Sequence, residues 1–162
     1  MTLTDFESAV QQLKGQPCWN IQAGAVGSLI NLHLGDKIAL EKPLPFPNPS
    51  LSPEAHKFRG QYILYIEDCP WRLDGPERVL ASWTDDNGPR GPIVTQLRAL
   101  IGQQVEMVSL SRPGLDLVLT FTGGYTLRIF PDQSDPDAGD NYALALIDRT
   151  YIVGARSQLI IE

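Results

Sequence analysis

The stretch YILYIEDCPWRLDG, residues 62–75, gathers residue types that enzymes use for catalysis. An apolar run leads into carboxylates, a thiol and a guanidinium, which belong to Glu67, Asp68, Cys69, Arg72 and Asp74. Carboxylates serve as general acids, and a thiol serves as a nucleophile when a base lies beside it. The spacing shows neither a nucleophile next to a base nor two carboxylates with separated pKa values in one cleft. We therefore predict no catalytic residue in this stretch.

Two helical patterns bracket the elements that must position these residues. Residues 4–15 carry apolar residues at helical spacing, start with a capping box of Thr4 and Glu7, and stop at Gly15. Residues 91–102 carry a second helical pattern. A shift of 87 positions superposes the two patterns, because Phe6, Val10 and Leu13 fall on Ile93, Leu97 and Leu100. The match predicts an internal repeat.

The strand patterns repeat as well. At the same shift, the alternating apolar residues of 30–34 fall on those of 117–121, and glycine-containing turns follow at 35–36 and 123–124. Both turns suit primed hairpins, which need a positive φ. Farther along, a shift of 80 positions places residues 62–75 on 142–155.

The repeat predicts the fold class. We expect an α+β, β-rich single domain of two similar halves, residues 1–84 and 91–162, each with one helix and several antiparallel strands. Residues 85–90 form a linker rich in Asp, Gly and Pro. Each half is too small to bury a core alone, so the halves pack face to face as a pseudo-two-fold resembling a fused homodimer.

The repeat also separates scaffold from residues available for binding. Asp68 has a counterpart in Asp148 and is interpreted as a strand-end aspartate that accepts bonds from a turn. Glu67, Arg72 and Asp74 have no matching charge in the second copy, and a recognition surface at this corner is one interpretation of them. The alternative is a solvated face with an Arg–carboxylate pair of about 0–1 kcal/mol.

Three further residues complete the predicted binding set. His33 lies on the polar face of the alternating NLHLG segment. Leu44 and Phe46 alternate with prolines in EKPLPFPNPSLSPEAHKF, a segment stiffened toward extended geometry. This segment either protects a sheet edge or docks into a partner.

Composition limits the function classes. A net charge of −6 disfavours binding to phosphate backbones, so we expect no nucleic-acid partner. The apolar residues form no run long enough for a membrane span, and Met1–Lys14 does not resemble a secretory signal, so we expect a cytoplasmic protein. No cofactor motif is present, and Cys18 and Cys69 match no metal or redox spacing.

Residues 132–140, the segment DQSDPDAGD, supply several carboxylates of the kind that calcium uses. They lack the EF-hand spacing. Two interpretations of this segment therefore stay open, an acidic loop between strands and a cation site, and no metal ligand is assigned.

GSLINLHLGD, RGQYILYIEDCPWRLDG and LDLVLTFTGGYTLRIF together resemble small uncharacterised bacterial α+β domains, some of them similar to immunity proteins that neutralise toxins. The resemblance implies a cytoplasmic bacterial protein without known enzymatic activity. We predict a non-catalytic module that binds a protein, and the acidic composition suits a basic partner. The alternative is a small-molecule binder or weak hydrolase with Glu67, Arg72 and His33 lining a cleft between the halves.

Overall fold

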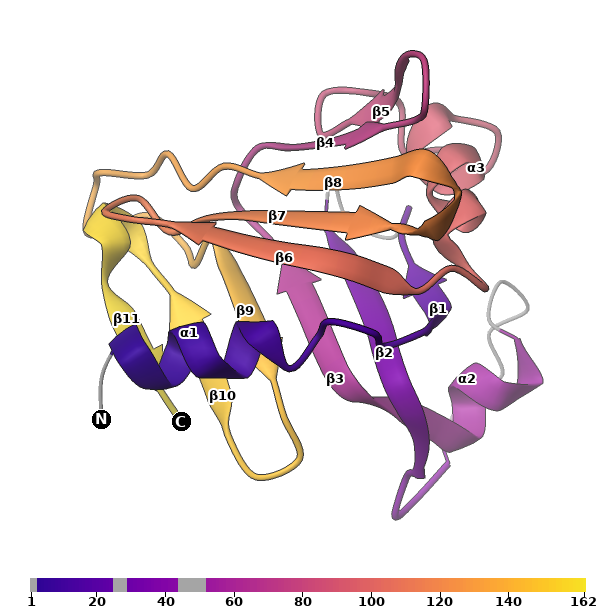
Figure 1. Ribbon diagram of the computed structural model, residues 1–162, viewed down its shortest axis with the longest axis horizontal. Coiled ribbons are helices and arrows are strands. Elements are labelled where there is room, and N and C mark those ends of the chain that lie inside the picture. Colours follow the sequence, from indigo (N-terminus) through magenta and orange to yellow (C-terminus); the bar gives the residue numbers. More distant parts are fainter. Residues whose placement is uncertain (1–2, 25–28, 44–51) are drawn as a thin grey trace.

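The computed structural model, which describes residues 3–24, 29–43 and 52–162, is built around two antiparallel sheets (Figure 1). The six-stranded sheet has the order β1 (Cys18–Gln22), β2 (Ile30–Ala39), β3 (Phe58–Ile66), β9 (Tyr142–Ala145), β10 (Thr150–Val153) and β11 (Leu159–Ile161). The five-stranded sheet has the order β5 (Val79–Ser82), β4 (Trp71–Asp74), β8 (Tyr125–Ile129), β7 (Asp116–Phe121) and β6 (Val105–Ser111). The mixed, β-rich α+β class is confirmed.

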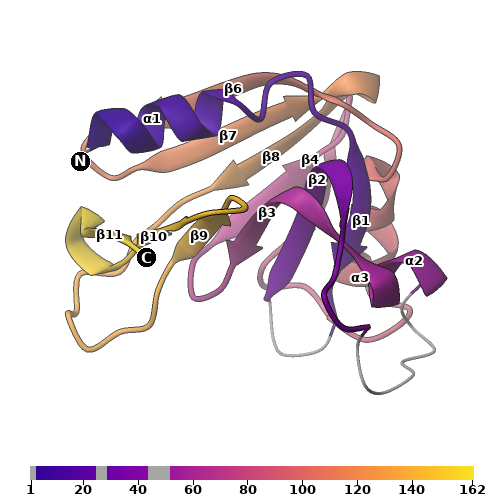
Figure 2. The ribbon, with the colours of Figure 1, turned by 90° about the horizontal axis from the view of Figure 1, so that it is seen from below.

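Short helices accompany the sheets. They are α1 (Leu3–Gln11), α2 (Pro53–Lys57) and α3 (Pro92–Leu97), and 3₁₀ turns occupy Arg98–Leu100, Thr122–Gly124 and Ala155–Ser157. Helix α1 packs on β6 and α3 packs on β5, at opposite ends of the molecule (Figure 1). Figure 2 shows α1 lying along the outermost strand, β6, of the five-stranded sheet.

The core fills the space between the sheets because alternate strand residues face inward. In β7 the inward residues are buried and the residues between them are partly exposed; the buried ones are Leu117, Leu119 and Phe121. The helices add the apolar stripes predicted from sequence, such as Phe6 and Val10 of α1 and Ile93 and Leu97 of α3. The single core therefore holds both sheets and both helices together.

Two local predictions are wrong. The chain does not turn at Gly35 and Asp36, because β2 continues through them to Ala39 and pairs with β3, with a register shift between Leu34 and Lys37. Gly35 has a φ of +81°, a conformation that glycine adopts without strain, and it forms a bulge in a continuous strand. The second error concerns Thr4, which lies inside α1 and so does not cap it. The turn at 123–124 is confirmed as the β7–β8 connection.

The predicted pseudo-two-fold duplication is not confirmed. The shift of 80 makes β9 the counterpart of β3, and these strands are antiparallel neighbours in one sheet, with Leu64 directly opposite Leu144. The strand order of the two sheets agrees under another correspondence, in which β3 matches β8, β4 matches β9 and β5 matches β10. The duplication and the division into 1–84, 85–90 and 91–162 stay predictions.

Backbone hydrogen bonds near the helix ends favour the part of the repeat in which the two copies are related by a shift of 87 positions. Gly15 donates its N–H to the Val105 carbonyl, and Gly102 donates its N–H to the Cys18 carbonyl. The shift of 87 converts the first bond into the second. The two chain segments that follow α1 and α3 are therefore joined reciprocally.

Candidate functional site

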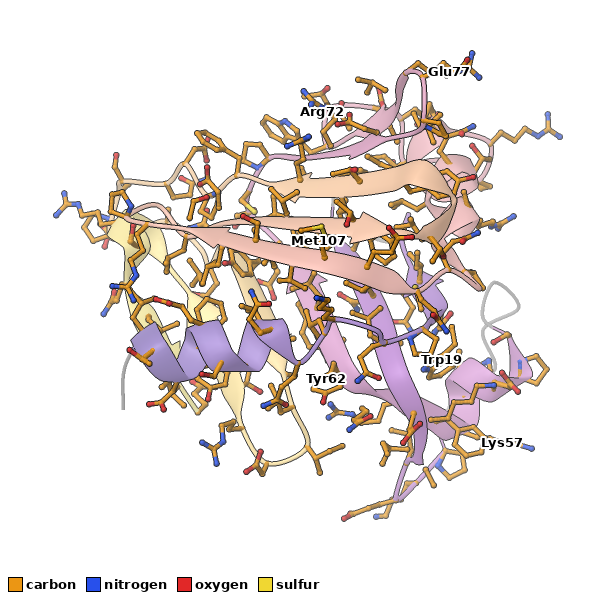
Figure 3. The ribbon with its side chains drawn as sticks, viewed as in Figure 1. Trp19, Lys57, Tyr62, Arg72, Glu77 and Met107 are labelled. Carbon is orange, nitrogen blue, oxygen red and sulfur yellow. The ribbon has the colours of Figure 1, made fainter. Side chains whose placement is uncertain are left out.

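The outer face of the five-stranded sheet carries the only two predicted binding residues that the structure brings into contact, among the residues described. Trp71 and Leu73 of β4 point into the core, so Arg72 and Asp74 project on the opposite face. Figure 3 shows Arg72 pointing away from the six-stranded sheet. The strand registers place Arg72 between Ser82 of β5 and Arg128 of β8.

Asp74 joins the two arginines. The Arg72 Nε donates to Asp74 Oδ1 at 2.7 Å and its Nη2 donates to Oδ2 at 3.1 Å. The Arg128 Nε also donates to Asp74 Oδ2, at 3.0 Å. The hydrogen bond from Arg72 is the main cause that holds the pKa of the Asp74 carboxyl below its usual value. Two guanidiniums thus share one carboxylate, which leaves one positive charge in excess.

Two exposed aromatic residues lie beside this charged group. Trp83 directly follows β5 and Phe130 directly follows β8, and their side chains are 45% and 56% exposed. Their backbones are fixed, because Trp83 N–H bonds to the Trp71 carbonyl and Phe130 N–H bonds to the Pro70 carbonyl. We call Arg72, Asp74, Trp83, Arg128 and Phe130 the aromatic–arginine patch.

The patch opens on a cavity of about 380 Å³. Residues of both predicted halves line it, among them Arg72, Trp83, Asp116, Val118, Arg128 and Phe130. Burial raises the pKa of the Asp116 carboxyl. The cavity therefore combines guanidinium donors, aromatic walls and one carboxylate at the seam where β4 meets β8.

A larger cavity of about 470 Å³ lies between the N-terminal end of α1, residues 112–115 and β11. Its lining is mostly apolar and includes Leu3, Leu159 and Ile161. Its charged lining residue, Arg112, forms an ion pair with Glu7 of α1. Arg112 is the one charged residue among the described residues that line this cavity, whereas Arg72, Asp116 and Arg128 line the cavity at the aromatic–arginine patch.

Glu67 lies away from the patch, at the corner after β3. Its side chain is exposed, and the backbones of Glu67 and Asp68 donate to the carbonyls of Asn141 and Asp140. Burial is the main cause that raises the pKa of the Glu67 carboxyl, and the charges of Asp140 and Asp68 add to it. Glu67 belongs to an acidic corner formed with residues of the 132–140 segment.

His33 is a structural residue of the six-stranded sheet. Only 6% of it is exposed, its ring lies 5.5 Å from the Trp19 ring, and its Nδ1 accepts the Gly60 N–H at 3.0 Å. Burial, with help from the charge of Arg59, lowers the His33 pKa to about 4. Glu67, Arg72 and His33 therefore do not meet in one cleft, as the small-molecule hypothesis expected. Leu44 and Phe46 lie outside the described residues.

The thiols and the metal-ligating side chains are the remaining candidates for chemistry among the described residues. Burial raises the pKa of the Cys18 and Cys69 thiols to about 12, so both stay protonated at neutral pH. Within residues 3–24, 29–43 and 52–162, no three His, Cys, Asp or Glu residues are arranged to hold a metal ion. The helices in these ranges are also too short and too polar to span a membrane.

Sequence reasoning missed Trp83, Arg128 and Phe130. Arg128 and Phe130 occupy alternate positions in YTLRIF, which marks them as outward residues once a strand is assumed. Their proximity to Arg72 depends on the pairing of β4 with β8, and local pattern does not reveal that pairing.

Comparison with known proteins adds no relative: no protein-family model, no curated protein and no solved structure matches this chain.

Proposed function

We propose that this protein is a non-catalytic, cytoplasmic protein-binding module and that the aromatic–arginine patch is its contact surface. The observation that carries this proposal is the exposure of Trp83 and Phe130 around a pair of arginines in a concave site. Binding hot spots are rich in Trp and Arg, and they lie in pockets from which a partner excludes water. Neutralisation of a bacterial toxin, as in immunity proteins, is one version of this function.

The lack of catalytic geometry supports binding over catalysis. The thiols are buried, the one buried histidine supports a backbone amide, and the patch carboxylate Asp74 is held by two guanidiniums. No described group in the patch is a nucleophile beside a free base.

A small anionic molecule is the second candidate ligand. The cavity volume falls in the range of small-molecule sites, roughly 300–1,000 Å³, and residues from both predicted halves line it. This candidate keeps the cleft of the alternative hypothesis, although only Arg72 of its three predicted polar residues is present.

The test compares binding by three forms of the protein. Tagged wild type, the double variant Trp83→Ser/Phe130→Ser and the control Ile147→Ser are used to capture proteins from the source organism. Ile147 is matched because it is 58% exposed and lies in the β9–β10 turn, outside the patch. A retained protein is then identified by mass spectrometry, purified and titrated against each form.

The proposal expects wild type and Ile147→Ser to bind the purified partner equally, and the patch variant to lose at least about 2 kcal/mol, or roughly thirtyfold in Kd. Backbone amides of β4, β5 and β8 should become protected from hydrogen exchange. Equal binding by the patch variant, with unchanged thermal unfolding, contradicts the proposal.

A further inference from the structure

Arg72 and Arg128 face each other directly across the β4–β8 pair. Like charges in this arrangement repel one another and destabilise the pair of strands. Asp74 offsets the repulsion by bonding to both guanidiniums, yet it neutralises only one of the two charges. Arg72, Arg128 and Asp74 together therefore carry one net positive charge, and Asp116 in the lining of the same cavity adds a negative one.

The two guanidiniums retain most of their hydrogen-bonding capacity. Each carries five N–H donors in a planar fork, and Asp74 accepts two bonds from Arg72 and one from Arg128. The planar fork matches a carboxylate, which accepts two parallel bonds. The side chains of both arginines are 49% exposed, so an incoming group can reach them.

The rings of Trp83 and Phe130 favour apolar side chains next to that carboxylate. Phe130 lies two residues beyond Arg128 along the chain, and Trp83 follows Ser82, the cross-strand partner of Arg72. Apolar side chains next to an incoming carboxylate would cover these rings and exclude water from the ion pair. Exclusion of water strengthens the attraction between the charges.

We propose that Arg72 and Arg128 bind a carboxylate side chain of a protein partner, carried on a segment with apolar neighbours. This inference rests on the proposed binding function and specifies the chemistry of the partner. It reverses, at the contact itself, the basic partner that the net charge of −6 suggests. The overall charge acts at long range, whereas the groups at the patch decide which side chain docks.

Asp116 provides a test of whether the incoming side chain is negative or positive. It lines the same cavity, and no ion-pair partner of its side chain is found among the described residues. An incoming carboxylate is repelled by Asp116, whereas an incoming ammonium group is attracted. Replacing Asp116 by Asn therefore strengthens binding of an acidic segment and weakens binding of a basic one.

The probes are short capped peptides in which leucine alternates with glutamate, glutamine or lysine, together with inorganic phosphate. Each is titrated into ¹⁵N-labelled protein while the backbone amides of β4 and β8 and the Nε–Hε signals of Arg72 and Arg128 are followed by NMR. Wild type is compared with Arg72→Gln, Arg128→Gln and Asp116→Asn, all checked for unchanged thermal unfolding.

The glutamate peptide should shift the patch signals and bind at least about tenfold more tightly than the glutamine peptide. Each Arg→Gln variant should lose about tenfold for the glutamate peptide, and Asp116→Asn should gain roughly threefold. Equal binding of the glutamine peptide, tighter binding of the lysine peptide, or no patch shift at about 5 mM glutamate peptide overturns the inference. Phosphate binding as tight as that of the glutamate peptide also overturns it, in favour of a small-anion site.

Failure of the carboxylate inference can be told apart from failure of the proposed binding function. If the captured partner needs Trp83 and Phe130 but binds Arg72→Gln and Arg128→Gln as well as wild type, the patch is the contact surface and the carboxylate inference fails. If the partner needs neither aromatic residue, the binding function at the patch fails, whatever the peptides do.

Discussion

The two sheets use one backbone arrangement for different purposes. At the seam between β4 and β8, Arg72 pairs with Arg128, and at the seam between β3 and β9, Tyr65 pairs with Ala143. Under the strand correspondence that preserves sheet order, these pairs occupy equivalent places, and Asp74 corresponds to Ala145. The side chains of Arg72 and Arg128 at the first seam are each 49% exposed and that of Asp74 is 20% exposed, whereas Ala143 and Ala145 are 8% and 5% exposed.

This difference concerns how much the outer face of each sheet contributes to stability. The outer face of the six-stranded sheet buries small side chains together with His33 and Ile63, so its residues stabilise the fold. The same face of the five-stranded sheet holds the half-exposed side chains of Arg72 and Arg128, and we expect their removal to cost little stability. Exposed ion pairs contribute about 0–1 kcal/mol, and such positions are free to serve a partner.

The largest expected effect comes from placing a charge on the stabilising face. Ala145→Asp introduces at β9 the residue that β4 has at Asp74, but in a buried position. We expect the free energy of unfolding to fall by about 3–4 kcal/mol, because a carboxylate is moved from water into a buried place that holds a small apolar side chain. Urea denaturation measures the change, with Ala145→Ser as the uncharged control. A loss below about 1 kcal/mol would show that the two faces are not as different as described.

Protonation of His33 should have the next largest effect. Its pKa is about 4 in the folded protein and near 6.5 when unfolded, so the folded state favours the neutral ring. The stabilisation is complete above pH 6.5 and is lost as the pH falls from 6.5 through 4, by about 2–3 kcal/mol. Unfolding free energies measured from about pH 8 down to about pH 4 cover this range and test the expectation.

His33→Asn is the matched variant for that measurement, since its side-chain oxygen can still accept the Gly60 N–H but does not titrate in this range. The pH dependence should be shallower in the variant than in wild type. Identical curves would assign the acid sensitivity to other groups.

The smallest effect is expected at the patch itself. Asp74→Ala leaves two arginines opposed without a carboxylate and should lower the unfolding free energy by about 1 kcal/mol, because Asp74 is partly buried but both of its arginine partners are about half exposed. The loss should shrink as salt is added, since salt screens the repulsion. A salt-independent loss larger than about 2 kcal/mol would mean that Asp74 stabilises the sheet in another way.

The sequence was sufficient to predict the elements but not their partners. The helical stripes of Phe6 and Ile93 and the alternation at Leu117 follow from local periodicity, and the structure contains these helices and this strand. The turn at Gly35 was predicted wrongly, because glycine with positive φ suits a bulge as well as a hairpin. Only the long-range pairing with β3 distinguishes the two.

The candidate site shows the same limit. Arg72 and Asp74 were identified because their charges have no match in the second copy, and they do contact each other. Arg128 was missed because strand register, which joins it to Arg72, is set by packing across the whole sheet. His33 was predicted to be polar and available, whereas the neighbouring Trp19 ring and Gly60 amide make it part of the scaffold.

The β4–β8 seam has a consequence for synthesis of the chain. Asp74 and Arg128 are 54 residues apart, so a ribosome releases β4 long before its inner neighbour exists. During that interval β4 pairs at most with β5, and its other edge presents unpaired backbone groups to which other chains can add. A partner that binds the proposed patch would dock only after translation has passed Phe130, so its binding to a nascent chain would report that β8 has paired with β4.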